Sequence, residues 1–157
     1  MKRRKRTSKK IPAKGRLRDM ADQLWSLAVK DDWACRCAVC GRREKLNSHH
    51  LLPRQHQATR YELMNGVCLC RHCHQFDANI SPHQNAAGWL YWLSEHHPAH
   101  HRWYTEQIET GAHRRFNGTT NAVYYCDVIR ELNQYVHEVD YDRIVGIKFG
   151  QWIEEQE

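Results

Sequence analysis

Apolar residues recur at helical spacing near the start of the chain. Five of them between positions 15 and 30 lie three or four residues apart: Leu17, Met20, Leu24, Leu27 and Ala28. This period places side chains on one face of a helix. The spacing predicts an amphipathic helix whose apolar stripe covers the cysteine-rich segment that follows.

The pattern becomes shorter and more irregular in the centre of the chain, where brief alternation and turn signals replace the helical period. The segments predicted there are, in order, a turn and strand over 35–47, a polar surface loop over 51–63, a turn at Asn65-Gly66, a strand over 67–69 and a helix from about Arg71 to about Ile80, with Ser81-Pro82 as its break.

Helical spacing returns in the second half of the chain, interrupted at Pro98 and Gly111 and capped near residues 117–120. The tryptophans of this half follow the apolar period, so we interpret them as core rather than as base-stacking surfaces. The chain therefore divides into a basic arm (1–12), a helix with a cysteine-rich module (13–82) and a helical extension (83–157), which is an α+β fold.

The net charge of +6 is distributed unevenly along the chain. Residues 1–18 hold ten Lys and Arg and no acid, residues 35–80 sum to +4, and residues 81–157 sum to −5. A polyanion such as DNA should therefore bind the arm and the centre. The candidate phosphate contacts are Lys2, Arg3, Arg4, Lys5, Arg6, Arg54, Arg60 and Arg71.

The compartment can be inferred from what the sequence lacks. No apolar run approaches the roughly 20 residues of a membrane span, and no apolar segment follows the basic start as in a secretory signal. We expect a cytoplasmic protein without a membrane partner, in which cysteines serve as metal ligands or free thiols rather than disulfides.

Two Cys-x-x-Cys pairs, Cys37/Cys40 and Cys70/Cys73, have the spacing of zinc knuckles. Four thiolates form a closed tetrahedral site, so they predict one structural Zn²⁺. Cys35 and Cys68 each precede a pair by two residues and leave alternative ligand sets open. We prefer the x-x spacing and interpret these two as free thiols, and Cys126 as a core residue.

Between these two pairs lie the histidine doublet His49-His50 and Asn65. A further histidine, His74, directly follows the last cysteine. This pattern resembles the HNH endonuclease family over residues 35–80. The stretch from the first helix through Trp92 is also similar to phage recombination nucleases of the Rap/NinG kind, in His-His-Leu-Leu-Pro-Arg, Ala-Thr-Arg-Tyr and Asn-Gly-Val-Cys-Leu-Cys. The resemblance implies a small ββα-metal HNH module braced by the four-cysteine zinc site.

The resemblance also implies a role for each of these residues. His49 and His74 would bind a catalytic divalent metal, His50 would be the general base, and Asn65 would hold the loop that orients His50. Many family members have Asp at this position, which favours Mg²⁺, whereas the nitrogen of His49 favours Mn²⁺, Ni²⁺ or Zn²⁺. The catalytic metal is left open among these four ions. A second helix histidine of the family is replaced by Ala78, so Asp77 or water would complete the shell. The remaining histidines, His83 among them, show no ligand spacing.

These features predict a metal-dependent HNH endonuclease that hydrolyses DNA phosphodiesters in phage recombination or processing. The alternative is a non-catalytic zinc-binding nucleic-acid module. A protein-interaction adaptor is a further rival, but it leaves the basic arm unexplained. If the DNA is branched, paired cuts favour a homodimer joined through the acidic helical half.

Deleting residues 2–10 removes seven cations. DNA binding should weaken equally for all sequences, and the slope of log affinity against log salt should flatten by up to about 0.9 per lost phosphate contact. Fluorescence anisotropy at several salt concentrations measures this slope, and an unchanged slope would show that the arm does not touch DNA.

Overall fold

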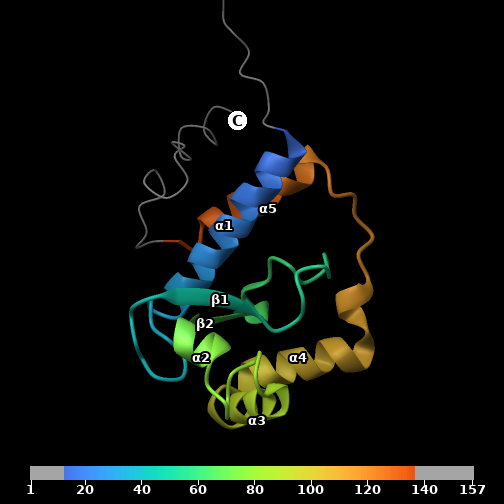
Figure 1. Ribbon diagram of the computed structural model, residues 1–157. Helices are drawn as coiled ribbons and strands as arrows, with labels where there is room; N and C mark the ends of the chain where they lie inside the picture. Colours follow the sequence, from blue (N-terminus) through green and yellow to red (C-terminus); the bar gives the residue numbers. More distant parts are fainter. Residues whose placement is uncertain (1–12, 137–157) are drawn as a thin grey trace, which may run out of the picture.

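The structure is a computed structural model that describes residues 13–136 of the 157-residue chain. It is a mixed α+β fold with one small sheet, as the sequence predicts (Figure 1). The basic arm and residues 137–157 lie outside the described residues. The elements are α1 (Lys14–Asp32), β1 (Leu46–His50), η1 (Leu63–Asn65), β2 (Gly66–Cys70), α2 (Arg71–Gln75), α3 (Ala86–His96), α4 (Pro98–Thr110), η2 (Ala112–Arg114) and α5 (Ala122–Asn133).

Helix α1 packs against other elements on two of its faces. Its apolar stripe packs on α5, in a buried cluster that joins Leu17 and Leu24 to Tyr125 and Ile129. The predicted helix is therefore confirmed, and it covers the cysteine-rich segment as expected, although its apolar stripe packs mainly on α5. A second face of α1, which includes Trp25 and Val29, approaches the sheet.

Strands β1 and β2 form an antiparallel pair in which His49 lies opposite Val67 and His50 lies opposite Gly66. Successive side chains of a strand point to opposite faces. His50 and Ser48 accordingly face α1, where Ser48 Oγ donates to the carbonyl of Ser26 at 2.7 Å. His49 faces the other way, so the doublet is divided between the two sides of the sheet.

All five residues of β2 are buried, because both faces of the sheet are covered. Val67 and Leu69 join Trp89 and Leu93 of α3 in a second apolar cluster, which also includes buried cysteines. Figure 1 shows the resulting order, with α1 and α5 on one side of the sheet and α3 and α4 on the other.

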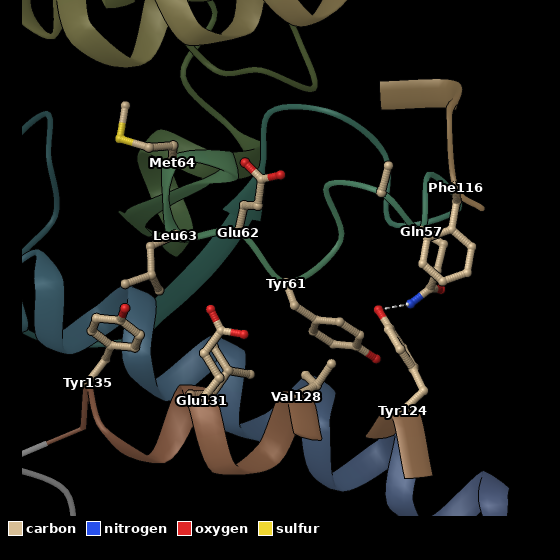
Figure 2. A pocket seen from close by; sticks show the side chains of 12 residues that line it. Gln57, Tyr61, Glu62, Leu63, Met64, Phe116, Tyr124, Val128, Glu131 and Tyr135 are labelled. Carbon is tan, nitrogen blue, oxygen red and sulfur yellow. Dashed lines mark hydrogen bonds between the residues drawn. The ribbon is translucent and has the colours of Figure 1, made fainter. Parts of the chain in front are cut away.

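A surface cavity of about 470 Å³ lies between the loop before η1 and helix α5. Figure 2 shows Tyr61, Tyr124 and Glu131 around it, with Gln57 Nε2 donating to the Tyr124 hydroxyl at 2.8 Å. None of the predicted site residues lines this cavity, so it is separate from the cysteines and histidines considered below.

Helix α2 ends at Gln75, and the prediction that it continues to about Ile80 is wrong. The Asp77 carboxylate accepts hydrogen bonds from the backbone N–H groups of Asn79 and Ile80, at 2.9 and 3.1 Å. These bonds lower the pKa of Asp77. An Asp side chain that binds the backbone ahead of it competes with helix formation, which explains the early turn.

None of the helices in residues 13–136 is both long and apolar enough to cross a membrane. Of the tryptophans in α3 and α4, Trp89 is buried in the second apolar cluster, whereas Trp92 and Trp103 are half-buried.

Gly66 is required where β2 meets α1, because a Cβ there would lie 2.2 Å from Val29 Cγ2 and 3.0 Å from the Trp25 ring. Gly66→Ala should lower the free energy of unfolding by about 1–3 kcal/mol, the usual cost of overpacking. Gly15→Ala is the matched control, since nothing lies within 4 Å of its added methyl. That change in α1 should stabilise slightly. Guanidinium titration measures both, and equal stability of the two variants would contradict the prediction.

Candidate metal centres and functional site

The structure brings Cys37, Cys40, Cys70 and Cys73 into one group whose sulfurs all lie within 4.8 Å of one another. The Cys40 and Cys70 sulfurs are 3.7 Å apart. Sulfurs bound tetrahedrally at 2.3 Å from one Zn²⁺ would be separated by about 3.8 Å. The four cysteines could therefore hold a structural metal such as zinc with little rearrangement.

The first cysteine pair lies on a tight turn. Gly41 takes a φ of 71°, a left-handed conformation that glycine adopts without strain, and its N–H donates to the carbonyl of Cys37 at 2.9 Å. The N–H of Ala38 donates to the carbonyl of Cys68, which ties this turn to β2. The second pair spans the junction of β2 and α2, so the four-cysteine group joins three separate elements.

The extra cysteines lie outside this group. Cys68 is fully buried on the α1 face of β2, and burial raises its pKa to about 12. The sulfur of Cys68 is not among those that lie within 4.8 Å of one another. Cys35 follows α1 in a left-handed conformation, with φ 49°. The placement agrees with the x-x ligand set.

A second group consists of His49, His74 and His83. His49 Nδ1 lies 3.2 Å from His74 Nε2, and His83 Nε2 lies 3.1 Å from the same atom. Three nitrogens at about 2.0–2.1 Å from one ion at tetrahedral angles would lie about 3.3 Å apart. One ring nitrogen of His74 cannot satisfy two neutral imidazoles by hydrogen bonding alone, whereas a shared cation suits all three.

His83 is the residue that reasoning from the sequence missed. Asp77, which the sequence offers beside water as a means of completing the shell, is not in the group, because its carboxylate makes the turn that ends α2. The buried Ser81 then donates to the carbonyl of His74 at 2.7 Å and accepts from the N–H of His83. This turn returns His83 to His74. The Ser81-Pro82 break was its signal in the sequence, which we interpreted only as a helix end.

Burial favours the neutral form of His49 and His74. It lowers the pKa of His49 to about 3, with His74 and His83 as further causes, and it lowers the pKa of His74 below its usual value. Neutral imidazole is the form that binds a metal. His74 Nδ1 is buried and has no hydrogen-bond partner among the described residues.

His50 lies on the opposite face of β1 and takes no part in the histidine group. Its ring stacks on Trp25 with 3.7 Å between centroids and an angle of 12°. Its Nε2 is 3.0 Å from the carbonyl oxygen of Arg60. A carbonyl only accepts, so Nε2 carries the hydrogen and the lone pair is on Nδ1. Burial lowers the pKa of His50 to about 4.

Asn65 is fully buried and closes the long loop that follows β1. Its Oδ1 accepts from the N–H of Leu52 at 2.7 Å, and its Nδ2 donates to the carbonyls of Leu52 and Thr59. Both polar atoms of the amide are thus satisfied by backbone. The side chain holds the two ends of the loop together, which is the position in which the sequence interpretation places it.

The three central arginines are placed differently. Arg54 and Arg71 are exposed, and Arg71 lies 5.5 Å above the ring of the exposed Phe76. Arg60 turns inward to Asp22, with 2.6 Å between Nη2 and Oδ2 and 13% of its side chain exposed. A DNA contact by Arg60 would require this ion pair to open.

Comparisons with protein-family models, with curated proteins and with solved structures found no match for this chain.

The four-cysteine group predicts a specific pattern of metal loss. Cys40→Ser or Cys73→Ser should release about one zinc per chain and unfold the sheet region, because metal binding supplies folding free energy in such small sites. Elemental analysis with circular dichroism measures both effects. Cys35→Ser and Cys68→Ser are the matched controls and should keep the metal; loss of zinc from the Cys35 variant would overturn the ligand assignment.

Proposed function

We propose that this protein is a metal-dependent endonuclease of the HNH class that hydrolyses DNA phosphodiester bonds. The convergence of His49, His74 and His83 carries the proposal, because three imidazoles around one point leave further coordination positions open for a phosphate. In a closed structural site such as the four-cysteine group, no position remains for a substrate.

The order of the elements supports this assignment. Strands β1 and β2 are followed immediately by α2, the arrangement expected of a ββα-metal module. His49 comes from β1 and His74 from α2, the two positions that the resemblance implies for ligands. His83 would be a third ligand, supplied from beyond the module by the turn at Ser81.

His50 has the features of a general base. It is neutral, its Nε2–H is held by the Arg60 carbonyl, and its Nδ1 carries the lone pair that would take a proton from water. The water oxygen would bond to phosphorus as the bond to the leaving 3′ oxygen breaks. By the resemblance, the products are a 5′ phosphate and a 3′ hydroxyl. A divalent ion held by the three histidines would stabilise the charge on the phosphate oxygens.

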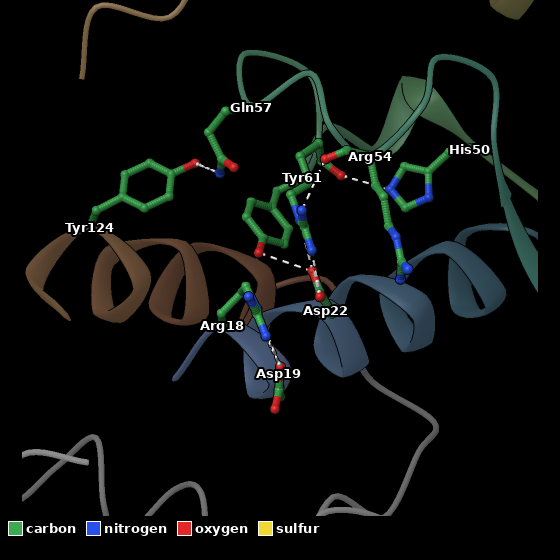
Figure 3. Close-up of polar contacts among 9 residues, drawn as sticks. Arg18, Asp19, Asp22, His50, Arg54, Gln57, Tyr61 and Tyr124 are labelled. Carbon is green, nitrogen blue, oxygen red and sulfur yellow. Dashed lines mark hydrogen bonds and ion pairs between the residues drawn. The ribbon is translucent and has the colours of Figure 1, made fainter. Parts of the chain in front are cut away.

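The divided doublet constrains how DNA would bind. β1 ends at His50, so His49 and His50 leave the same strand end toward opposite faces. The proposal requires the scissile phosphate to lie across this strand end. Figure 3 shows the Arg54 side chain alongside the His50 ring, and its positive charge contributes to the low pKa of His50. Arg54 is exposed, so it is a suitable phosphate contact there.

Cleavage of supercoiled, linear and four-way-junction DNA, with Mg²⁺, Mn²⁺, Ni²⁺ or Zn²⁺ added in turn, tests the proposal. His50→Ala should keep metal and DNA binding but cut ~10²–10⁴-fold more slowly, the contribution of a positioned base. His49→Ala, His74→Ala and His83→Ala should weaken metal binding and respond to added metal. Asn65→Ala should slow cleavage with less effect on the metal.

His72→Ala is the matched control, because this histidine lies on α2 with 61% of its side chain exposed and outside the group. It should cut at the wild-type rate. If the wild-type protein binds DNA but cuts none of the substrates with any metal, the proposal of an enzyme fails. The protein would then be interpreted as a zinc-binding nucleic-acid module.

A further inference from the structure

We propose that α1 is part of the hydrolytic site: Asp22 and Trp25, which lie outside the HNH pattern, are positioning residues that fix the orientation and tautomer of His50. This inference extends the proposed function. It assigns a role to two residues of a helix whose sequence indicates only packing, and it is carried by the contacts of residues 59–62.

Asp22 holds Arg60 through a two-pronged ion pair. Its Oδ1 accepts from Arg60 Nε at 2.9 Å and its Oδ2 accepts from Arg60 Nη2 at 2.6 Å. The hydroxyl of Tyr61 donates to the same Oδ1 at 3.0 Å. Burial, with Asp22 as the next cause, raises the pKa of Tyr61, so this hydroxyl remains a donor. The carboxylate therefore fixes two consecutive residues of the loop.

The Arg60 backbone is the part that His50 uses. The Arg60 carbonyl accepts the His50 Nε2–H. The Arg60 side chain donates through Nη1 to the carbonyl of Arg54 at 2.9 Å. The preceding carbonyl, that of Thr59, is held by Asn65. The acceptor for His50 is thus fixed from both sides, by Asn65 through the backbone before it and by Asp22 through its own side chain.

Trp25 fixes the plane of the ring. It lies one turn after Asp22 on α1, so both side chains reach the same loop. Its Nε1–H donates to the carbonyl of Glu62 at 3.0 Å, which holds the indole flat against His50. Gly66, the strand partner of His50, leaves the room that the indole needs.

A second ion pair on α1 shows why this one is different. Arg18 and Asp19 are neighbours on the same helix, with side chains 51% and 62% exposed, and they contact no other element through this bond (Figure 3). Exposed pairs of this kind contribute little. The Asp22–Arg60 pair is more shielded and joins α1 to the loop, so the two carboxylates are a matched pair for mutation.

The test compares Asp22→Asn with Asp19→Asn in the full-length, zinc-loaded protein. Each removes one negative charge from the same helix. Single-turnover cleavage by the Asp22 variant should fall about 10–100-fold, the range for residues that orient a site through another group. Its KM for DNA and its metal content should be unchanged. Asp19→Asn should match wild type in every respect.

A spectroscopic measurement separates positioning from general destabilisation. Long-range ¹H–¹⁵N spectra of the imidazoles should show a single Nε2–H tautomer for His50 in wild type and in Asp19→Asn, and a tautomer mixture in Asp22→Asn. Arg60→Lys keeps the positive charge but cannot make both hydrogen bonds to Asp22. Its tautomer ratio should therefore lie between those of wild type and Asp22→Asn. Should Asp22→Asn fail to fold, the Arg60→Lys spectrum and rate decide the question.

The outcomes distinguish this inference from the proposed function. An unchanged His50 spectrum in both Asp22→Asn and Arg60→Lys, or an equal loss of rate in Asp19→Asn, would overturn the positioning role. So would a changed spectrum with a wild-type rate. If wild type cuts nothing, the proposed function fails, while the spectra still report whether α1 holds the His50 ring.

Discussion

The register of β1 against β2 is the constraint on which the rest of this structure depends. Two strands of five residues set His49 opposite Val67 and His50 opposite Gly66. A slip of one residue would exchange the faces of all the side chains on a strand. His50 would then meet the histidine group, and His49 would meet Trp25. The strand pairing therefore determines which of the two histidines lies on each face of the sheet.

Tertiary packing protects this register because β2 is covered on both faces. Gly66 and Cys68 lie against α1, while Val67 and Leu69 lie against α3. An isolated two-stranded hairpin is marginally stable in water. Here the cysteine group links the turn before β1 to the end of β2, and a bound metal would add its binding free energy to a small core.

Local patterns were enough to predict much of the site. The x-x spacing identified the four cysteines that meet, and the family resemblance, rather than the turn signal, pointed to Asn65, whose amide binds the backbone of the loop. The third histidine could not be predicted, because it depends on Asp77 bonding to the backbone and ending α2 early. The ion pair of Arg60 with Asp22 could not be predicted from the sequence either. No sequence pattern around a single arginine in a polar loop distinguishes a buried ion pair from an exposed contact.

His83 comes from a segment of its own, and this has a consequence for dynamics. An ion held by His49, His74 and His83 would close two loops at once, as two crosslinks would. Unlike a covalent crosslink, its strength would follow the free concentration of the ion relative to its dissociation constant. Amide hydrogen exchange around residues 81–85 would then slow as metal becomes more abundant, so this short turn would report the metal supply to which the protein is exposed.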